Sequence, residues 1–80
     1  MNKSRNNILS SKNFLEADDI STITSCGRTK SYQMINELNS ELKKKGIKIL
    51  SGKVNARYFY EKYGLNELLD EHNAYVNGGI

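Results

Sequence analysis

The chain has 80 residues, of which 38% are hydrophobic, and a net charge of +3. A chain of this length forms one domain at most and has room only for a shallow cleft, which argues against an enzyme. With a single cysteine and a single histidine it offers no internal disulfide and no zinc site, so we expect a reducing, intracellular setting without metal or cofactor.

The first twelve residues show no periodicity. They mix Asn, Ser, Lys and Arg, which predicts a mobile basic arm over residues 1–12. No long apolar run follows Lys3 and Arg5, so we expect neither a signal peptide nor a membrane span, and a cytoplasmic protein. Phe14 and Leu15 come next and predict either a short extended segment or a lid on the core.

A short helix is predicted over residues 17–24. Apolar residues recur at helical spacing, and Asp18 and Asp19 place negative charge in the first turn, where the helix dipole favours it. Ser25, Cys26 and Gly27 then interrupt the pattern, and Gly27 is a suitable N-cap for the next helix. Two helices joined by so short a turn must pack at a steep angle.

A long amphipathic helix is predicted over residues 28–45. The residues expected to face inward are Ser31, Met34, Ile35, Leu38 and Leu42, and those expected to face outward are Lys30, Gln33, Asn36, Glu37, Ser40, Lys43 and Lys44. Gly46 is well placed to end this helix, and the lysines of its last turn complement the negative end of the helix dipole.

A small β-hairpin is predicted after Gly46. Residues 47–50 and 53–55 flank the dipeptide Ser51-Gly52, which suits a hairpin turn, and we interpret the pair as a wing. A short helix with aromatic residues follows over 56–63, ended by Gly64, and Phe59 and Tyr63 are expected in the core. The fold class is therefore mainly α with a small β-hairpin wing, a winged helix-turn-helix over residues 13–64.

The chain ends in an acidic segment. Leu65, Leu68, Leu69, His72 and Val76 have helical spacing, which predicts a helix that either docks on the domain or awaits a partner. With the residues that follow, it forms the third part of the chain, an acidic helix and frayed tail over 65–80. The sequence leaves the oligomeric state open: the protein could form a dimer through the apolar residues of this helix, or be a monomer whose copies bind DNA cooperatively.

Basic charge is concentrated in the middle of the chain. Residues 28–62 hold nine basic and three acidic residues, whereas residues 63–80 hold three acidic and no basic ones. A polyanionic partner is the natural inference, although solvated lysines are common in proteins that bind nothing charged. On this pattern we expect double-stranded DNA as the partner.

The helix-turn-helix region resembles the excisionase family of phages and integrative elements, small winged-helix proteins. The resemblance covers residues 14–63 and rests on Asp19-Ile20, Cys26, Arg28, and Tyr32 with Met34-Ile35. The stretches Ile35–Leu42, Lys45-Gly46, Gly52–Val54 and Arg57–Phe59 look like a branch from mobile elements of low-GC Gram-positive bacteria. The resemblance to the excisionase family implies a DNA-binding protein that catalyses no reaction itself.

Four polar residues depart from the family pattern around the helix crossing. The family usually has a small apolar residue at the position of Ser21 and an apolar residue at that of Thr24. It usually has Gly at the position of Ser25 and Val or Ala at that of Ser31. These four polar residues indicate either a looser core or hydroxyl groups that donate hydrogen bonds to the preceding turn.

The candidate DNA contacts lie on the long helix and around the wing. They are Arg28, Thr29, Lys30, Gln33, Asn36, Lys48, Ser51, Lys53 and Arg57. The helix residues would enter the major groove, where Arg pairs with guanine and Gln with adenine, and the wing residues would lie near the backbone or the minor groove. The alternative is an exposed polar helix face and a charged hairpin edge that resists aggregation.

Other chemistry-bearing residues have simpler explanations. Cys26 is expected to be a small buried apolar residue and His72 an exposed polar residue of the last helix. Glu67, Asp70 and Glu71 are expected to be solvated rather than an acid/base pair, and no nucleophile, phosphate loop or metal spacing indicates an enzyme. A further alternative is stacking on single-stranded bases by the aromatic residues Tyr58, Phe59, Tyr60 and Tyr63.

Two functions follow from these predictions. The first is sequence-specific duplex-DNA binding, either as an excisionase that bends DNA and helps an integrase assemble, or as a transcriptional regulator that blocks or recruits RNA polymerase. The second is a protein-interaction module in which the winged helix is a scaffold and the acidic helix docks on a partner. Basic and polar residues on the outward face of the long helix favour DNA over protein.

Overall fold

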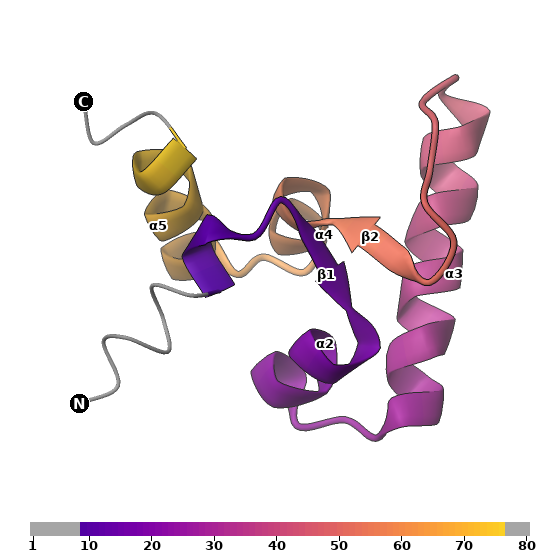
Figure 1. Cartoon of the computed structure of the whole chain (residues 1–80), viewed down its shortest axis with the longest axis horizontal. Helices are drawn as coiled ribbons and strands as arrows, with labels where there is room; N and C mark the ends of the chain where they lie inside the picture. Colours follow the sequence, from indigo (N-terminus) through magenta and orange to yellow (C-terminus); the bar gives the residue numbers. More distant parts are fainter. Residues whose placement is uncertain (1–8, 77–80) are drawn as a thin grey trace. The chain divides into compact units, whose positions relative to one another are not determined.

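The computed structural model describes residues 9–76 and shows a mainly helical chain (Figure 1). After a helical turn at residues 9–11, the elements are β1 (Phe14–Glu16), α2 (Ala17–Thr24), α3 (Arg28–Lys44), β2 (Lys53–Asn55), α4 (Ala56–Lys62) and α5 (Asn66–Val76). They group into two compact units. We call Phe14–Asn55 the helix-turn-helix unit, and residues 9–13 with 56–76 the aromatic unit.

This division cuts the chain at different places from those predicted. The predicted winged domain covered residues 13–64, but α4 groups with α5 and with residues 9–13 rather than with α2 and α3. In the part of the predicted mobile basic arm that the structure describes, residues 9–11 are helical and the Lys12 amide donates to the Leu9 carbonyl. Residues 1–8 of that arm and residues 77–80 of the predicted frayed tail lie outside the described residues.

The helix-turn-helix unit contains the two predicted helices, α2 and α3, packed on each other. The Asp19 carboxylate accepts a hydrogen bond from the Glu16 amide at the start of α2, which satisfies a backbone donor that has no partner within the helix. Gly27 is the N-cap of α3, as predicted. Gly46, at φ 82°, follows the last turn of α3, and the Ile47 amide donates to the Leu42 carbonyl.

The core of this unit is the apolar face of α3 against α2 and the strands. All five residues predicted to face inward on α3 are buried, and they are joined by Leu15, Ala17, Ile20 and Val54. All seven residues predicted to face outward are exposed. The helical periodicity of the sequence therefore predicted both faces of α3 correctly.

The two-stranded antiparallel sheet has a different partner from the one predicted. β2 pairs with β1, with Leu15 opposite Val54, and residues 47–50 are not a strand. This pairing places two completely buried side chains next to each other, whereas Ile47 and Leu50 are each about half exposed. The predicted local hairpin is wrong because burial favours the non-local pairing. Of the two predictions for Phe14 and Leu15, the extended segment is confirmed.

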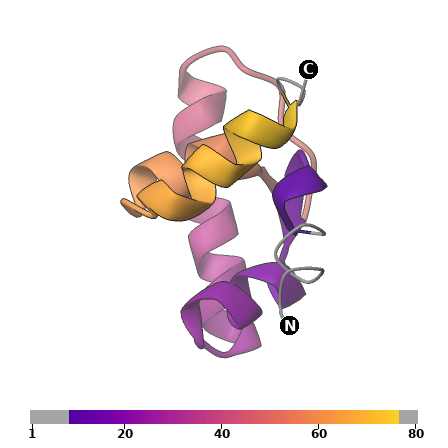
Figure 2. The same ribbon diagram turned by 90° about the vertical axis from the view of Figure 1, so that its left-hand side faces the viewer.

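The aromatic unit is built from α4 and α5, which lie side by side in both views (Figures 1 and 2). Phe59 and Tyr60 are fully buried, with ring centroids 6.0 Å apart. Gly64, at φ 67°, follows α4, and the Leu65 amide donates to the Tyr60 carbonyl. Phe59 is in the core as predicted, but Tyr63 is 40% exposed, with its ring 4.9 Å from that of Phe59.

His72 joins α5 to the helical turn at residues 9–11. Its Nδ1 lies 2.9 Å from the carbonyl oxygen of Ser10, and because a carbonyl only accepts, Nδ1 carries the hydrogen and donates. The Ser10 hydroxyl also donates to the Glu71 carboxylate at 3.4 Å. The prediction that His72 is an exposed polar residue is therefore wrong. It is buried because it lies on the apolar face of α5 and has a backbone partner there.

Candidate nucleic-acid interface

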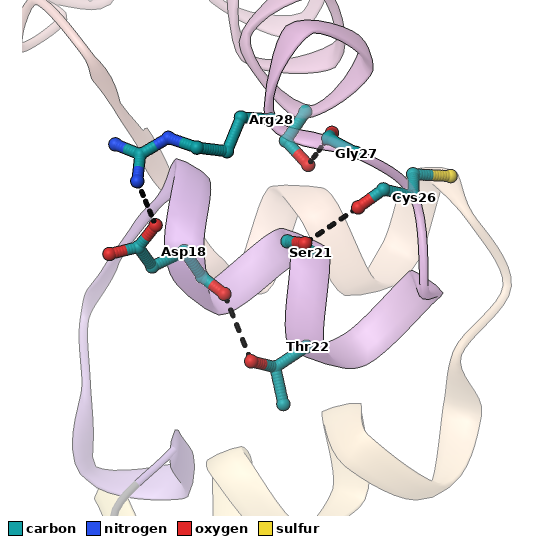
Figure 3. A network of polar contacts seen from close by, with 7 residues as sticks. Asp18, Ser21, Thr22, Cys26, Gly27 and Arg28 are labelled. Atoms are coloured by element: carbon teal, nitrogen blue, oxygen red, sulfur yellow. Dashed lines mark hydrogen bonds and ion pairs between the residues drawn. The ribbon is translucent and has the colours of Figure 1, made fainter.

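The turn between α2 and α3 is held by side-chain hydroxyl groups (Figure 3). Ser21 donates to the Cys26 carbonyl at 2.6 Å, which ties the body of α2 to the end of the turn. Thr24 donates to the Ile20 carbonyl at 2.8 Å and accepts from the Cys26 amide at 3.2 Å. The bonds to the Cys26 carbonyl and amide satisfy backbone groups of the turn, which lie outside both helices.

A third hydroxyl acts on the other side of the turn. Ser31 is completely buried and donates to the Gly27 carbonyl at 2.9 Å, in addition to the helical bond from its own amide to that oxygen. Ser25 has φ 63°, and its amide donates to the Ser21 carbonyl. Of the two alternatives for the departures from the family pattern, the structure shows a hydrogen bond to the preceding turn for Thr24 and Ser31, whereas Ser21 donates forward, to Cys26.

Cys26 is half-buried rather than buried as predicted. Its carbonyl faces Ser21, and its sulfur points away from that bond (Figure 3). The backbone of Cys26 therefore connects the turn to α2 through two hydrogen bonds, while its thiol is free.

The first turns of α3 present a polar, basic face to solvent. All five predicted contacts on this helix are exposed: Arg28, Thr29, Lys30, Gln33 and Asn36. Thr29, Gln33 and Asn36 follow one another at spacings of four and three residues, so they share one side of the helix, opposite the buried stripe. The structure therefore places these five predicted residues on the N-terminal half of one helix.

Arg28 makes an ion pair across the turn. Its terminal nitrogen lies 3.1 Å from a carboxylate oxygen of Asp18 in α2, and both side chains are mostly exposed (Figure 3). A hydrogen bond with the Tyr32 side chain, followed by the charge of Asp18, raises the pKa of the Arg28 guanidinium above its ordinary value. Arg28 therefore stays charged and is oriented by two neighbours.

The segment from Gly46 to Gly52 runs back alongside α3 (Figure 1). Asn39 holds it there: its side-chain amide donates to the Lys53 carbonyl at 2.8 Å and to the Leu50 carbonyl at 3.4 Å. Asn39 is buried, so these bonds tie the loop to the inner side of α3, and the Leu50 carbonyl also accepts from the Lys53 amide. We call residues 46–52 the wing loop.

The wing loop brings two more predicted residues close to α3. Ser51 and Asn36 both line an open hollow of about 280 Å³ between helix and loop. Lys48 lines the neighbouring hollow together with Lys43. Polar and basic groups of the helix and the loop thus border the same depressions.

Lys53 and Arg57 are placed differently from the other predicted contacts. Lys53 lies in β2 with its ammonium 2.5 Å from the Glu16 carboxylate of β1, so its charge is paired across the sheet. Arg57 lies on α4 in the aromatic unit, where it pairs with Glu61 at 3.5 Å. The structure therefore does not group Arg57 with the residues of the helix-turn-helix unit.

The sequence predictions missed Asn39 and the carboxylate of Asp18 as parts of this region. Asn39 falls within the inward spacing Ile35, Leu38, Asn39, Leu42, so the helical periodicity is the signal that could have identified it as an inward residue of α3. Asp18 was assigned only to the dipole of its own helix, and nothing in the sequence indicates its pairing across the turn.

Of the four aromatic residues considered for stacking on single-stranded bases, Tyr63 is exposed, and the other three are buried or half-buried. Phe59 and Tyr60 are fully buried and cannot reach a base. Tyr58 is half-buried, with the Lys62 ammonium 5.6 Å from the centre of its ring.

Among residues 9–76, no helix combines the length and apolar character that crossing a bilayer requires, and no group of three acidic, His or Cys side chains is placed to hold a metal ion.

Comparison with known proteins gives one informative relative. The chain is 40% identical over 50 residues to the ICEBs1 excisionase of Bacillus subtilis (strain 168), an alignment that covers 62% of this chain and 78% of the excisionase. The chain belongs to this excisionase family. No family model matches the sequence, and no solved structure matches it. The resemblance inferred from the turn residues is thus confirmed by an alignment much longer than the turn.

Proposed function

We propose that this protein binds duplex DNA sequence-specifically through its winged helix-turn-helix and serves a mobile element as an excisionase or a transcriptional regulator. The observation that carries the proposal is the exposed row of polar and basic residues on the first turns of α3, presented by a turn that is hydrogen-bonded on both sides. Similarity to an excisionase supports a small DNA-binding protein of a mobile element that is not an enzyme.

In this proposal the start of α3 enters the major groove. Arg28 has the planar fork that matches the two acceptors of a guanine edge, and Gln33 can pair with adenine in the same way. Thr29, Lys30 and Asn36 lie beside them and can contact either bases or phosphates. A rigid turn suits this role because readout of base edges requires the helix to be held in one orientation.

The wing loop would follow the DNA backbone. Lys48 is exposed and can neutralise a phosphate, and Ser51 can donate to a phosphate oxygen. Lys53 contributes less in this proposal, because a phosphate must compete with Glu16 for its ammonium. Arg57 belongs to the other unit, and its part in binding is proposed from the sequence alone.

Relatedness to an excisionase favours the excisionase role over that of a regulator. An excisionase would cooperate on repeated sites and have an integrase as its protein partner, whereas a regulator would act on RNA polymerase at an operator. We propose self-association on DNA only for the first role. Both roles require the same duplex-binding face, so DNA binding is the property to test first.

The test is selection from a random-sequence duplex pool at near-physiological salt, with sequencing of the bound fraction. We expect an enriched motif, and direct repeats of that motif would indicate cooperative, excisionase-like assembly. Retention without enrichment, lost steeply as salt is raised, would mean only generic attraction to phosphate. No retention would contradict the proposal and favour the protein-interaction module, with α5 as its docking helix.

A further inference from the structure

Arg28, a predicted base-reading residue, has a carboxylate in contact, that of Asp18. Asp18 lies in the first turn of α2 and Arg28 at the first position of α3, so the ion pair joins the two helices at their N-terminal ends (Figure 3). The side chains are 72% and 66% exposed, respectively. An ion pair this exposed contributes little to folding stability, so substitution of Asp18 should leave the fold intact.

Tyr32 lies one turn after Arg28 on α3. It follows Arg28 by four residues, which places both side chains on the same side of the helix, and its side chain is the largest cause that raises the pKa of the guanidinium. Tyr32 is 43% exposed despite its large ring. The guanidinium thus lies at the exposed start of α3, where it is paired with Asp18 of α2.

A carboxylate in this position competes with DNA phosphates. Binding to random DNA depends on the number of phosphates that basic residues neutralise, and each one steepens the dependence of log K on log salt by about 0.9. While Arg28 is paired with Asp18, a phosphate gains little from it, because one anion merely replaces another. A guanine edge is different, since N7 and O6 accept two parallel hydrogen bonds from the guanidinium fork.

We propose that Asp18 is a specificity-determining residue that keeps Arg28 from binding phosphates on non-cognate DNA and releases it to a guanine edge at the cognate site. The inference rests on the proposed function and deepens it. Specificity is a ratio of two affinities, and weakening the non-specific one raises that ratio as effectively as strengthening the specific one.

The test removes the carboxylate and measures both affinities. Asp18→Asn is titrated with a random-sequence duplex and with the duplex enriched in the selection, over a series of salt concentrations. We expect about 3- to 10-fold tighter binding to the random duplex, a salt slope steeper by about 0.9, and a specificity ratio that falls by a similar factor. Asp18→Ser is a second carboxylate-free variant, and thermal melting verifies that both are folded.

Two controls separate this effect from a change of net charge. Glu67→Gln removes one exposed negative charge from α5, outside the helix-turn-helix unit, and should change binding less than about 1.5-fold. In an Arg28→Ala background, Asp18→Asn should have no more effect than Glu67→Gln. An equal gain with and without Arg28, or no gain in either Asp18 variant, would overturn the inference while leaving the proposed function intact. Wild-type protein that retains neither duplex would overturn both.

Discussion

In the helix-turn-helix unit, the polar groups around the turn bind nearby backbone, and the charged side chains of α3 face solvent. In the aromatic unit, Ser10 and His72 instead connect segments that are far apart in the sequence. Ser21 and Ser31 bond within a few residues, but His72 reaches Ser10 across the length of the chain. The two units also differ in the charge of their helices. α5 carries Glu67, Asp70 and Glu71 and no Lys or Arg, whereas α3 carries Arg28, Lys30, Lys43 and Lys44. The comparison indicates that one unit is organised to present a surface and the other to hold the chain together.

Phe59→Ala should produce the largest effect, on the stability of the aromatic unit. Phe59 is fully buried against two other rings, and truncation of such a residue costs about 3–5 kcal/mol, which is most of the stability of a small domain. Urea unfolding followed by circular dichroism measures the loss. Tyr75→Ala, at an exposed aromatic residue of α5, is the matched control, and a similar loss there would contradict the assignment of Phe59 to the core.

The double substitution Arg28→Ala and Lys30→Ala should remove DNA binding while the fold is kept. Each base contact of this kind is worth about 1–3 kcal/mol, so affinity for the selected duplex should fall by roughly 30-fold or more. Lys43→Ala with Lys44→Ala removes the same charge from the last turn of α3 and should cost far less. Equal losses in the two double variants would mean that binding follows net charge and not the start of the helix.

Asn39→Leu should destabilise the helix-turn-helix unit by an intermediate amount. The substitution keeps the volume but leaves the Lys53 carbonyl without its side-chain donor, at a cost of about 1–3 kcal/mol. Asn36→Leu, one turn earlier on the exposed face, should change stability by less than about 0.5 kcal/mol. Urea unfolding compares the two, and an unchanged midpoint for Asn39→Leu would show that the wing loop does not depend on this amide.

Ser25→Gly should have the smallest effect, and in the stabilising direction. Ser25 has φ 63°, and a side chain in this left-handed region costs about 1–2 kcal/mol, of which the greater freedom of Gly in the unfolded chain cancels about 0.4–1 kcal/mol. We expect a small net rise in melting temperature. Ser51→Gly, where φ is not positive, should lower it slightly, and a fall in both variants would show that Ser25 is not strained.

The helix-turn-helix could be predicted from the sequence to within a residue at most of its ends. Spacings of three and four residues determine which side chains share a face of a helix, and Gly46, whose φ is 82°, marks the end of α3 through its own backbone freedom. For the same reason the exposed candidate contacts on α3 could be predicted as a group. Each of these properties depends on residues fewer than about five positions apart.

The errors concern residues whose partners are far away in the sequence. β2 was assigned to a neighbouring segment, but its partner is β1, and Leu15 and Val54 are brought together only when the core forms. His72 was treated as exposed because no nearby residue could satisfy it, and its partner proved to be the Ser10 carbonyl. Local patterns carry no information about such pairs.

The sequence by itself thus determined the helices, the N-cap Gly27 and the polar face of α3, because backbone hydrogen bonds and side-chain periodicity within a helix are local. Only the tertiary structure decided the pairing of β1 with β2, the bonds from Asn39 to the wing loop and the contact between Asp18 and Arg28. These depend on which surfaces are buried together and which distant polar groups then need a partner.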